Sequence, residues 1–270
     1  MLLAVNVGNS RIQLGFFEND RCVLRFQFKI ATDINKTSDE YLSLIKALVR
    51  EQNVSGEPVT ASVLSSVVPQ LTPVFCDTLL RLTESRPVLV GPGVKTGFPI
   101  KTDIPSELGT DMVANASAVL NSDEIKGSAG KASVIVDMGT VTTVSAINRF
   151  GEYIGCSLFP GVQISLDALH GRTAQLPNVA LSTPPRAIGR NSQESVRSGV
   201  ILGNAMMLDG FVERFAREMK TSPDKMNLFI TGEFAKSMTG ICRHEFVLDE
   251  DMTLKGLYYI YRNTVSASSN

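Results

Sequence analysis

Two segments of the chain share one pattern of apolar and polar positions. Residues 2–17 and 133–148 each begin with an apolar run. A short turn follows, which consists of a short polar residue, any residue, a glycine and a hydroxyl or amide residue. After the turn each segment continues as an apolar or alternating run. Such runs on either side of a short polar turn predict β-hairpins, with tips at 6–10 and 137–140. The segments start 131 residues apart, about half the chain. The pattern therefore indicates either a duplicated α/β protein with a cleft between its halves or two unrelated hairpins.

The rest of the chain alternates between helix-like and strand-like periods, which is typical of α/β proteins. Thr37–Glu40 have the spacing of a capping box, and apolar residues follow them at helical intervals. The longest helix is predicted from Asn191, with Glu194 three residues later, to about Lys220. The other predicted elements are strands at 59–68, 88–90 and 226–232, a helix at 70–83, and helices that begin near residues 109 and 234.

The longest predicted helix contains three glycines, Gly199, Gly203 and Gly210. Glycine inside a helix is less favourable than alanine by about 1 kcal/mol. We therefore expect another backbone or a ligand to approach the helix closely at these positions.

The composition argues against several classes of protein. The 26 basic and 27 acidic residues leave a net charge of −1, so there is no bulk attraction to nucleic acid or to an anionic membrane. The four cysteines lie far apart without a CxxC pair, and there are only two histidines, which argues against a zinc or histidine-rich metal site. No apolar run approaches a membrane span, and the first residues lack the pattern of a signal peptide. We expect a cytoplasmic protein with reduced thiols and no nucleic-acid or membrane partner.

The two predicted hairpin tips have a composition that suits phosphate groups. Glycine lets the backbone approach an anion closely, and amide and hydroxyl groups donate hydrogen bonds to its oxygens. Two such tips could hold the β- and γ-phosphates of a nucleotide, with an acidic residue at the strand end organising a metal ion. The chain contains neither GxxxxGKS/T nor GxGxxG, so the sequence does not indicate a Walker-type or Rossmann nucleotide site.

A longer series of motifs runs in order along nearly the whole chain. The motifs are Asn6–Ser10, Lys36–Glu40, Ser65–Pro69, Gly109–Asp111, Asp137–Thr143, Pro160–Gly161, Thr173–Pro177, Ile188–Ser192, Ser198–Gly199, Asp209–Gly210 and Thr231–Gly232. This ordered set resembles the type III pantothenate kinases, members of the superfamily of actin-like ATPases, sugar kinases and Hsp70-type ATPases. The resemblance implies an α/β fold of duplicated ribonuclease H-like domains with a central nucleotide cleft. It implies an N-terminal domain at 1–122 with the first phosphate loop and a C-terminal domain at 123–270 with the second.

The same resemblance implies a reaction and its partners. The expected activity is transfer of the γ-phosphate of ATP to the 4′-hydroxyl of pantothenate, the first step of coenzyme A biosynthesis. The expected cofactors are ATP with Mg²⁺ and a monovalent cation, K⁺ or NH₄⁺. The expected assembly is a homodimer.

Individual roles follow from the resemblance position by position. The first phosphate loop corresponds to Asn6, Val7, Gly8, Asn9, Ser10, Arg11, Ile12 and Gln13. Thr140 corresponds to an ATP contact in the second loop, and Asp137 corresponds to the ligand of the monovalent cation. The pantothenate contacts correspond to Gly109, Thr110, Asp111, Met112 and Thr173.

Within that set, Asp111 corresponds to the proton acceptor and is the predicted catalytic residue. A carboxylate at a helix start is kept ionised by the helix amides and can accept a hydrogen bond from the substrate hydroxyl. The alternative role for Asp111 is a plain N-terminal cap.

Four positions depart from the family pattern. Asn6 stands where the family has Asp, and Met112 stands where it has an Arg suited to the pantothenate carboxylate. Glu233 and Cys156 each replace a glycine. The first two changes touch the chemistry directly, so two alternatives stay open. One is a catalytically impaired relative with a nucleotide-binding or regulatory role, and the other is a kinase for another small alcohol that lacks the carboxylate.

Overall fold

A computed structural model describes residues 1–19, 21–52, 58–121 and 130–268 of the chain. The chain divides into two compact units, and each is described by itself. The first unit comprises Met1–Pro99, Asp103–Lys126 and Asp251–Asn270, and the second comprises Ile100–Thr102 and Gly127–Glu250. The predicted domain boundary after residue 122 falls within 122–129, outside the described residues.

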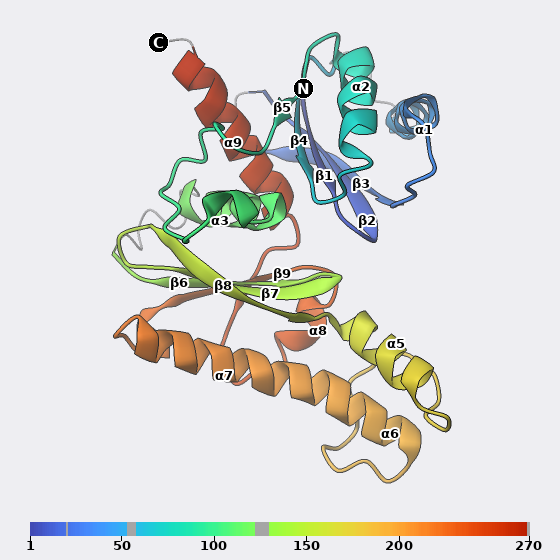
Figure 1. Cartoon of the computed structure of the whole chain (residues 1–270), viewed down its shortest axis with the longest axis vertical. Helices are drawn as coiled ribbons and strands as arrows, with labels where there is room; N and C mark the ends of the chain where they lie inside the picture. Colours follow the sequence, from blue (N-terminus) through green and yellow to red (C-terminus); the bar gives the residue numbers. More distant parts are fainter. Residues whose placement is uncertain (20, 53–57, 122–129, 269–270) are drawn as a thin grey trace. The chain divides into compact units, whose positions relative to one another are not determined.

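The first unit is built on a five-stranded mixed sheet (Figure 1). Its strands are β1 (Leu2–Val7), β2 (Arg11–Phe17), β3 (Leu24–Ala31), β4 (Ala61–Ser66) and β5 (Val88–Leu89), in the order β3-β2-β1-β4-β5. β1 pairs antiparallel with β2 and parallel with β4. The helices are α1 (Ser38–Glu51), α2 (Thr72–Thr83), α3 (Thr110–Asn121) and α9 (Met252–Ser268), with a 3₁₀ turn at Pro105–Glu107.

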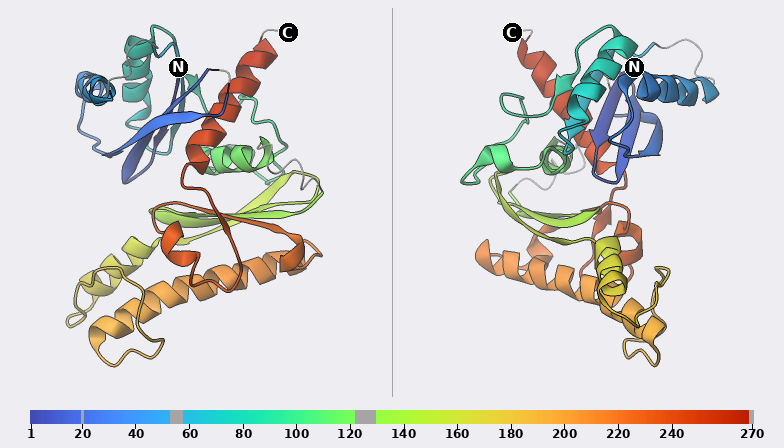
Figure 2. Two further views of the ribbon diagram at one scale, coloured as in Figure 1. Left: turned by 180° about the vertical axis from the view of Figure 1, so that it is seen from behind. Right: turned by 45° about the vertical axis from the view of Figure 1, so that its right-hand side comes forward.

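Both faces of this sheet are buried, because alternating residues of the central strands point to opposite faces and helices cover each face. Leu3, Val5 and Val7 share a core cluster with residues of α1 and α2, where the rings of Tyr41 and Phe75 lie 4.6 Å apart. The other face is covered by α9, on which α3 packs (Figures 1 and 2). Strands buried on both faces tolerate apolar residues at every position, which explains the continuous apolar run at the start of the chain.

The second unit repeats this sheet. Its strands are β6 (Ser133–Met138), β7 (Val141–Ile147), β8 (Tyr153–Pro160), β9 (Asn227–Thr231) and β10 (Val247–Leu248), in the order β10-β9-β6-β7-β8. β6 pairs antiparallel with β7 and parallel with β9, as β1 does with β2 and β4. The duplication predicted from the two hairpin patterns is therefore confirmed.

A long helical segment lies along one face of the second sheet (Figure 2). The helices of this unit are α5 (Val162–Arg172), α6 (Ser192–Arg197), α7 (Gly203–Glu218) and α8 (Ala235–Met238), with a π-helical turn at Ser198–Leu202 and a 3₁₀ turn at Pro223–Lys225. The ring of Phe159 on β8 stacks on that of Phe211 on α7, with centroids 5.7 Å apart. Helix α6 begins as predicted, because Asn191 accepts a hydrogen bond from the amide of Glu194.

The three glycines of this segment do not serve a close approach within the chain. Apart from the adjacent residues and the backbone of the helix itself, no atom of the described residues lies within 4 Å of a Cβ built on Gly199, Gly203 or Gly210. All three lie on the exposed side of the segment, whereas Val200 and Leu208 are among those that face the core. Within the described residues no other backbone approaches these glycines, and their contact with a ligand or a second chain stays a prediction.

Two findings concern the cysteines and the helices. None of the four cysteines forms a disulfide. In the described ranges, no helix combines the length and the apolar character that crossing a bilayer requires.

Candidate active site

The first predicted phosphate turn joins β1 to β2. Its glycine, Gly8, donates its amide hydrogen to the carbonyl oxygen of Arg11 at 3.0 Å, and a Cβ on Gly8 would lie only 2.9 Å from that oxygen. Asn9, Ser10 and Arg11 are exposed, whereas the side chains of Val7 and Ile12 are fully buried. Of the eight residues predicted for this loop, Val7 and Ile12 can therefore offer a ligand only their backbone groups.

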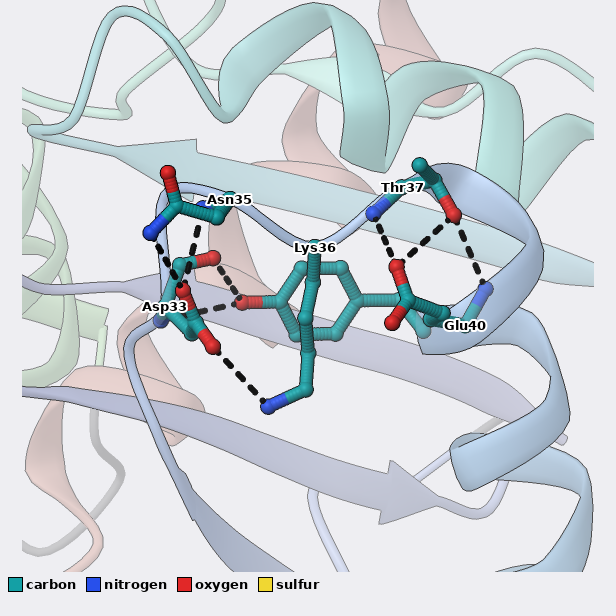
Figure 3. Close-up of polar contacts among 6 residues, drawn as sticks. Asp33, Asn35, Lys36, Thr37 and Glu40 are labelled. Atoms are coloured by element: carbon teal, nitrogen blue, oxygen red, sulfur yellow. Dashed lines mark hydrogen bonds and ion pairs between the residues drawn. The ribbon is translucent and has the colours of Figure 1, made fainter.

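The segment after β3 supports this turn. The hydroxyl of Thr32 donates to the carbonyl oxygen of Gly8 at 2.6 Å, and the amide of Thr32 donates to that of Ser10 at 3.1 Å. The next residue, Asp33, accepts hydrogen bonds from the amide of Asn35 and from Lys36 Nζ (Figure 3). The hydrogen bond from Asn35 is the main cause that lowers the pKa of Asp33. These contacts hold the polypeptide beside the turn in one conformation.

The predicted capping box completes the same segment. The hydroxyl of Thr37 accepts the amide hydrogen of Glu40, and the Glu40 carboxylate accepts the amide hydrogen of Thr37 at 2.8 Å (Figure 3). This reciprocal pair fixes the start of α1.

A hydrogen-bonded chain links the first turn to the predicted pantothenate turn. Asn6 lies near the end of β1, Ser65 near the end of β4, and Thr110 at the start of α3. Ser65 Oγ lies 2.9 Å from Asn6 Oδ1 and 2.9 Å from Thr110 Oγ1. The structure therefore brings two of the predicted groups, residues 6–13 and 109–112, next to each other within the first unit.

Asp111 lies inside the first turn of α3, so it is not a residue that precedes the helix as a simple cap. Its Oδ1 accepts the amide hydrogen of Met112 at 2.8 Å. Burial nevertheless raises the pKa of Asp111 and outweighs the hydrogen bonds from the Met112 and Asp111 amides, which lower it. The larger effect on the pKa of Asp111 therefore comes from removal from water and not from the helix amides.

Gly109 provides the room for this arrangement. A Cβ on Gly109 would lie 2.7 Å from Asp111 Oδ1 and 3.1 Å from the terminal methyl of Met112. A glycine at this position therefore allows both side chains to fold back over the turn.

In the second unit, three of the motifs meet at the turn between β6 and β7. A Cβ on Gly161 would overlap the carbonyl oxygens of Gly139 and Thr140, and the amide of Gly161 donates to Thr140 at 3.2 Å. Gly232 has a φ of +98°, and a Cβ there would lie 2.5 Å from the Met138 amide nitrogen. The strand ends of β6, β8 and β9 thus converge around Asp137–Thr140.

Thr173 is not part of that group within the second unit. It is exposed, follows the last residue of α5, and donates its hydroxyl hydrogen to the carbonyl oxygen of Leu169 at 2.7 Å. Gly161 caps the other end of α5, and a helix of 11 residues is about 16 Å long.

Among the described residues there is no group of three or more His, Cys, Asp or Glu side chains that could hold a metal ion. Gly139 and Thr140, in the same turn as Asp137, have carbonyl oxygens next to Gly161, and oxygen donors of this kind suit hard cations.

Several residues of these groups were not predicted as site residues. Ser65 belongs to the motif Ser65–Pro69, but its position opposite Asn6 comes from the pairing of β1 with β4. Thr32 carried no signal, because its bonds to Gly8 and Ser10 depend on the pairing of β2 with β3.

Comparisons with known proteins connect this geometry to a family. A sequence model described as type III pantothenate kinase matches residues 2–214. Proteins named type III pantothenate kinase are similar over nearly their whole length. One from Moorella thermoacetica is 37% identical over 265 residues, covering 98% of this chain and 100% of the relative. One from Pelobacter propionicus is 38% identical over 264 residues, covering 97% and 98%.

Solved structures show the same fold at low sequence identity. A putative Baf family transcriptional activator from Campylobacter jejuni superposes with a TM-score of 0.61 at 15% identity, covering 98% of this chain and 99% of the other. A putative N-acetylmannosamine kinase from Listeria monocytogenes gives 0.52 at 12% identity, covering 99% of each. The fold is that of duplicated ribonuclease H-like units, as in actin-like ATPases and sugar kinases. With the family match over most of the chain, it follows that the chain belongs to the type III pantothenate kinase family.

Proposed function

We propose that this protein transfers the γ-phosphate of ATP to the 4′-hydroxyl of pantothenate, the first step of coenzyme A biosynthesis. The observation that carries the proposal is the chain from Asn6 through Ser65 to Thr110. It ties the turn proposed for phosphate to the turn that holds Asp111. Family membership supplies the substrate, through relatives that carry this name over their full length.

In this proposal each turn has a separate task. Residues 6–13 and Thr140 bind the phosphates of ATP through backbone amides and short polar side chains, which suit anionic oxygens. Gly109, Thr110, Met112 and Thr173 contact pantothenate. Asp111 accepts the hydrogen bond of the attacking hydroxyl and orients it. Phosphoryl transfer depends mainly on such positioning and on neutralising charge.

The proposed cations have oxygen donors in the second unit. Asp137 and the carbonyl groups of its turn would hold a monovalent cation, K⁺ or NH₄⁺. Mg²⁺ is usually bound by one or two carboxylates together with substrate phosphates. It neutralises developing charge on the phosphates. Asn6 cannot supply a carboxylate, so this position contributes no charged ligand to Mg²⁺. A homodimer in the cytoplasm, without nucleic-acid or membrane partners, belongs to the same proposal.

The product assay tests the activity directly. Purified protein is incubated with ATP, Mg²⁺, K⁺ and pantothenate, and phosphopantothenate is measured by mass spectrometry. We expect product from the natural chain and none above background from Asp111→Asn. If the natural chain binds ATP but forms no product, the proposed activity is wrong.

Met112 favours one alternative, a kinase for a small alcohol without a carboxylate. A charged hydrogen bond contributes about 1.5–3 kcal/mol, so an Arg at this position would bind a carboxylate roughly tenfold to a hundredfold more tightly. Binding of pantothenate is compared with that of uncharged pantothenamides, in the natural chain and in Met112→Arg. A clear preference of the natural chain for the acid contradicts this alternative.

Asn6 and Met112 together favour the other alternative, a nucleotide-binding relative with impaired catalysis. In that case the double variant Asn6→Asp, Met112→Arg forms phosphopantothenate and the natural chain does not. Comparable rates in both chains exclude it.

A further inference from the structure

Ser65 lies where three elements of the first unit meet. β1 and β4 pair in parallel, and Asn6 and Ser65 are directly opposite each other in that register. Ser65 is fully buried, and its hydroxyl lies 2.9 Å from both Asn6 Oδ1 and Thr110 Oγ1. A buried hydroxyl between two polar side chains determines how both of them are oriented.

The protons in this chain can be assigned from the chemistry of each group. An amide oxygen only accepts, so the single proton of Ser65 is donated to Asn6 Oδ1. Ser65 Oγ then accepts from Thr110, whose other acceptor, the carbonyl oxygen of Ser66, is further away at 3.4 Å. Donation therefore runs in one direction, from Thr110 through Ser65 to Asn6.

The direction of donation decides which face of Asn6 a ligand meets. Because Oδ1 accepts from Ser65, the NH₂ group forms the other branch of the Asn6 amide and is the part that can donate to a ligand. Two N–H donors suit a phosphate oxygen, whereas an ionised carboxylate, which the family has at this position, can only accept hydrogen bonds. The hydrogen bond from Ser65 thus leaves Asn6, which departs from the family pattern, as a hydrogen-bond donor to phosphate.

We propose that Ser65 is a positioning residue that fixes the Asn6 amide as a hydrogen-bond donor to a nucleotide phosphate and couples it to the Thr110–Asp111 turn. The inference rests on the proposed function only for the identity of the nucleotide and of the reaction. Ser65 acts through Asn6 and Thr110 and touches no reacting atom.

The test compares two buried serines of the same strand. Ser62 is also buried on β4, but its hydroxyl has no hydrogen-bond partner among the described residues. The dissociation constant of Mg²⁺–ATP is measured by calorimetry for Ser65→Ala and Ser62→Ala. We expect Ser65→Ala to weaken ATP binding about threefold to tenfold, the range of one hydrogen bond, and Ser62→Ala to change it less than twofold. We also expect kcat for product formation to fall in Ser65→Ala, because Thr110 loses its partner beside Asp111.

Two further variants separate positioning from a general structural role. Ser65→Cys keeps nearly the same volume but is a weak donor, and it should weaken ATP binding in the same direction while the unfolding temperature stays near that of the natural chain. In an Asn6→Ala background, Ser65→Ala should change ATP binding less than twofold, because the group that it positions is gone.

The outcomes distinguish this inference from the proposed function. Equal effects of Ser65→Ala and Ser62→Ala, or an undiminished effect of Ser65→Ala in the Asn6→Ala background, overturn the inference. A natural chain that forms no phosphopantothenate but shows the coupling between residues 6 and 65 in ATP binding overturns only the proposed activity.

Discussion

Burial and hydrogen bonding act in opposite directions on the carboxyl group of Asp111, and burial has the larger effect on its pKa. The proposed role requires the ionised form, because a protonated carboxyl cannot accept the hydroxyl proton. As the pH falls through the raised pKa, the carboxylate is lost earlier than in a carboxyl with the ordinary value of 3.8. We expect kcat to fall on the acid side with an apparent pKa above 3.8. A pH–rate profile of Glu107→Gln, which removes an exposed acid shortly before α3, should match that of the natural chain.

The same shift predicts that Asp111→Asn gains stability while it loses activity. Between pH 3.8 and the raised pKa, the folded state binds more protons at Asp111 than the unfolded state, so the stability contributed by this group declines as the pH rises. Asparagine has no charge to bury and keeps an oxygen for the Met112 amide. We expect a higher unfolding temperature than that of the natural chain at pH 7, a difference that vanishes below pH 3.8, and a loss of kcat of about 10²–10⁴-fold. A lower unfolding temperature at pH 7 contradicts the argument.

Sequence motifs located the residues of these turns better than they predicted the environment of those residues. Asp111 was placed at a helix start because the motif is local. The direction of its pKa shift depends on packing against other parts of the unit, which no local pattern encodes. Ser65 was visible only as part of a motif, since its contacts come from the register between two strands that are far apart in the sequence.

At the scale of elements, two glycines lie in contrasting surroundings, since one is crowded by backbone and the other is not. Gly232 has a φ of +98° and lies against the Met138 backbone, whereas Gly210 lies inside α7 with open space around it. We expect Gly232→Ala to lower the free energy of unfolding by about 1–3 kcal/mol and to weaken ATP binding. We expect Gly210→Ala to raise it by about 0.5–1 kcal/mol. Chemical denaturation measures both, and a destabilising Gly210→Ala would show that a partner does approach this helix.

Elements with strong local signals were predicted, and those defined by packing were not. The capping box before α1 and the two hairpins carry their own turn and cap residues. Helix α9 was not predicted, and its interior contains Gly256 and several aromatic residues with low helix propensity. Its place is decided by α3, because a Cβ on Gly256 would overlap the carbonyl group of Ala114, and Thr253 donates to the buried Asn115 at 2.7 Å. The π-helical turn at Ser198–Leu202 likewise lacked a sequence signal.

At the scale of the whole molecule, the duplication extends to the order and direction of every strand pair. The sequence revealed it only at the hairpins, because these turns need particular residues, while the strands after them need only apolar ones. The two units are not simply consecutive in the sequence. Residues 251–270 return to the first unit, where α9 covers one face of the sheet.

Because α9 packs on the first sheet, we expect the stability of the first unit to depend on the C-terminal segment. A chain that stops at Glu250 loses the buried residues Leu254, Leu257 and Ile260, and their removal uncovers one face of the first sheet. Burying a leucine or isoleucine side chain contributes about 1.5–3 kcal/mol, so three of them are comparable to the whole stability of many domains. We expect hydrogen exchange to become fast in β1 and β4 while β6 and β9 stay protected. A chain that stops at Val265 keeps these three residues and should behave like the natural protein. Equal loss of protection in both sheets would mean that the two units do not fold separately.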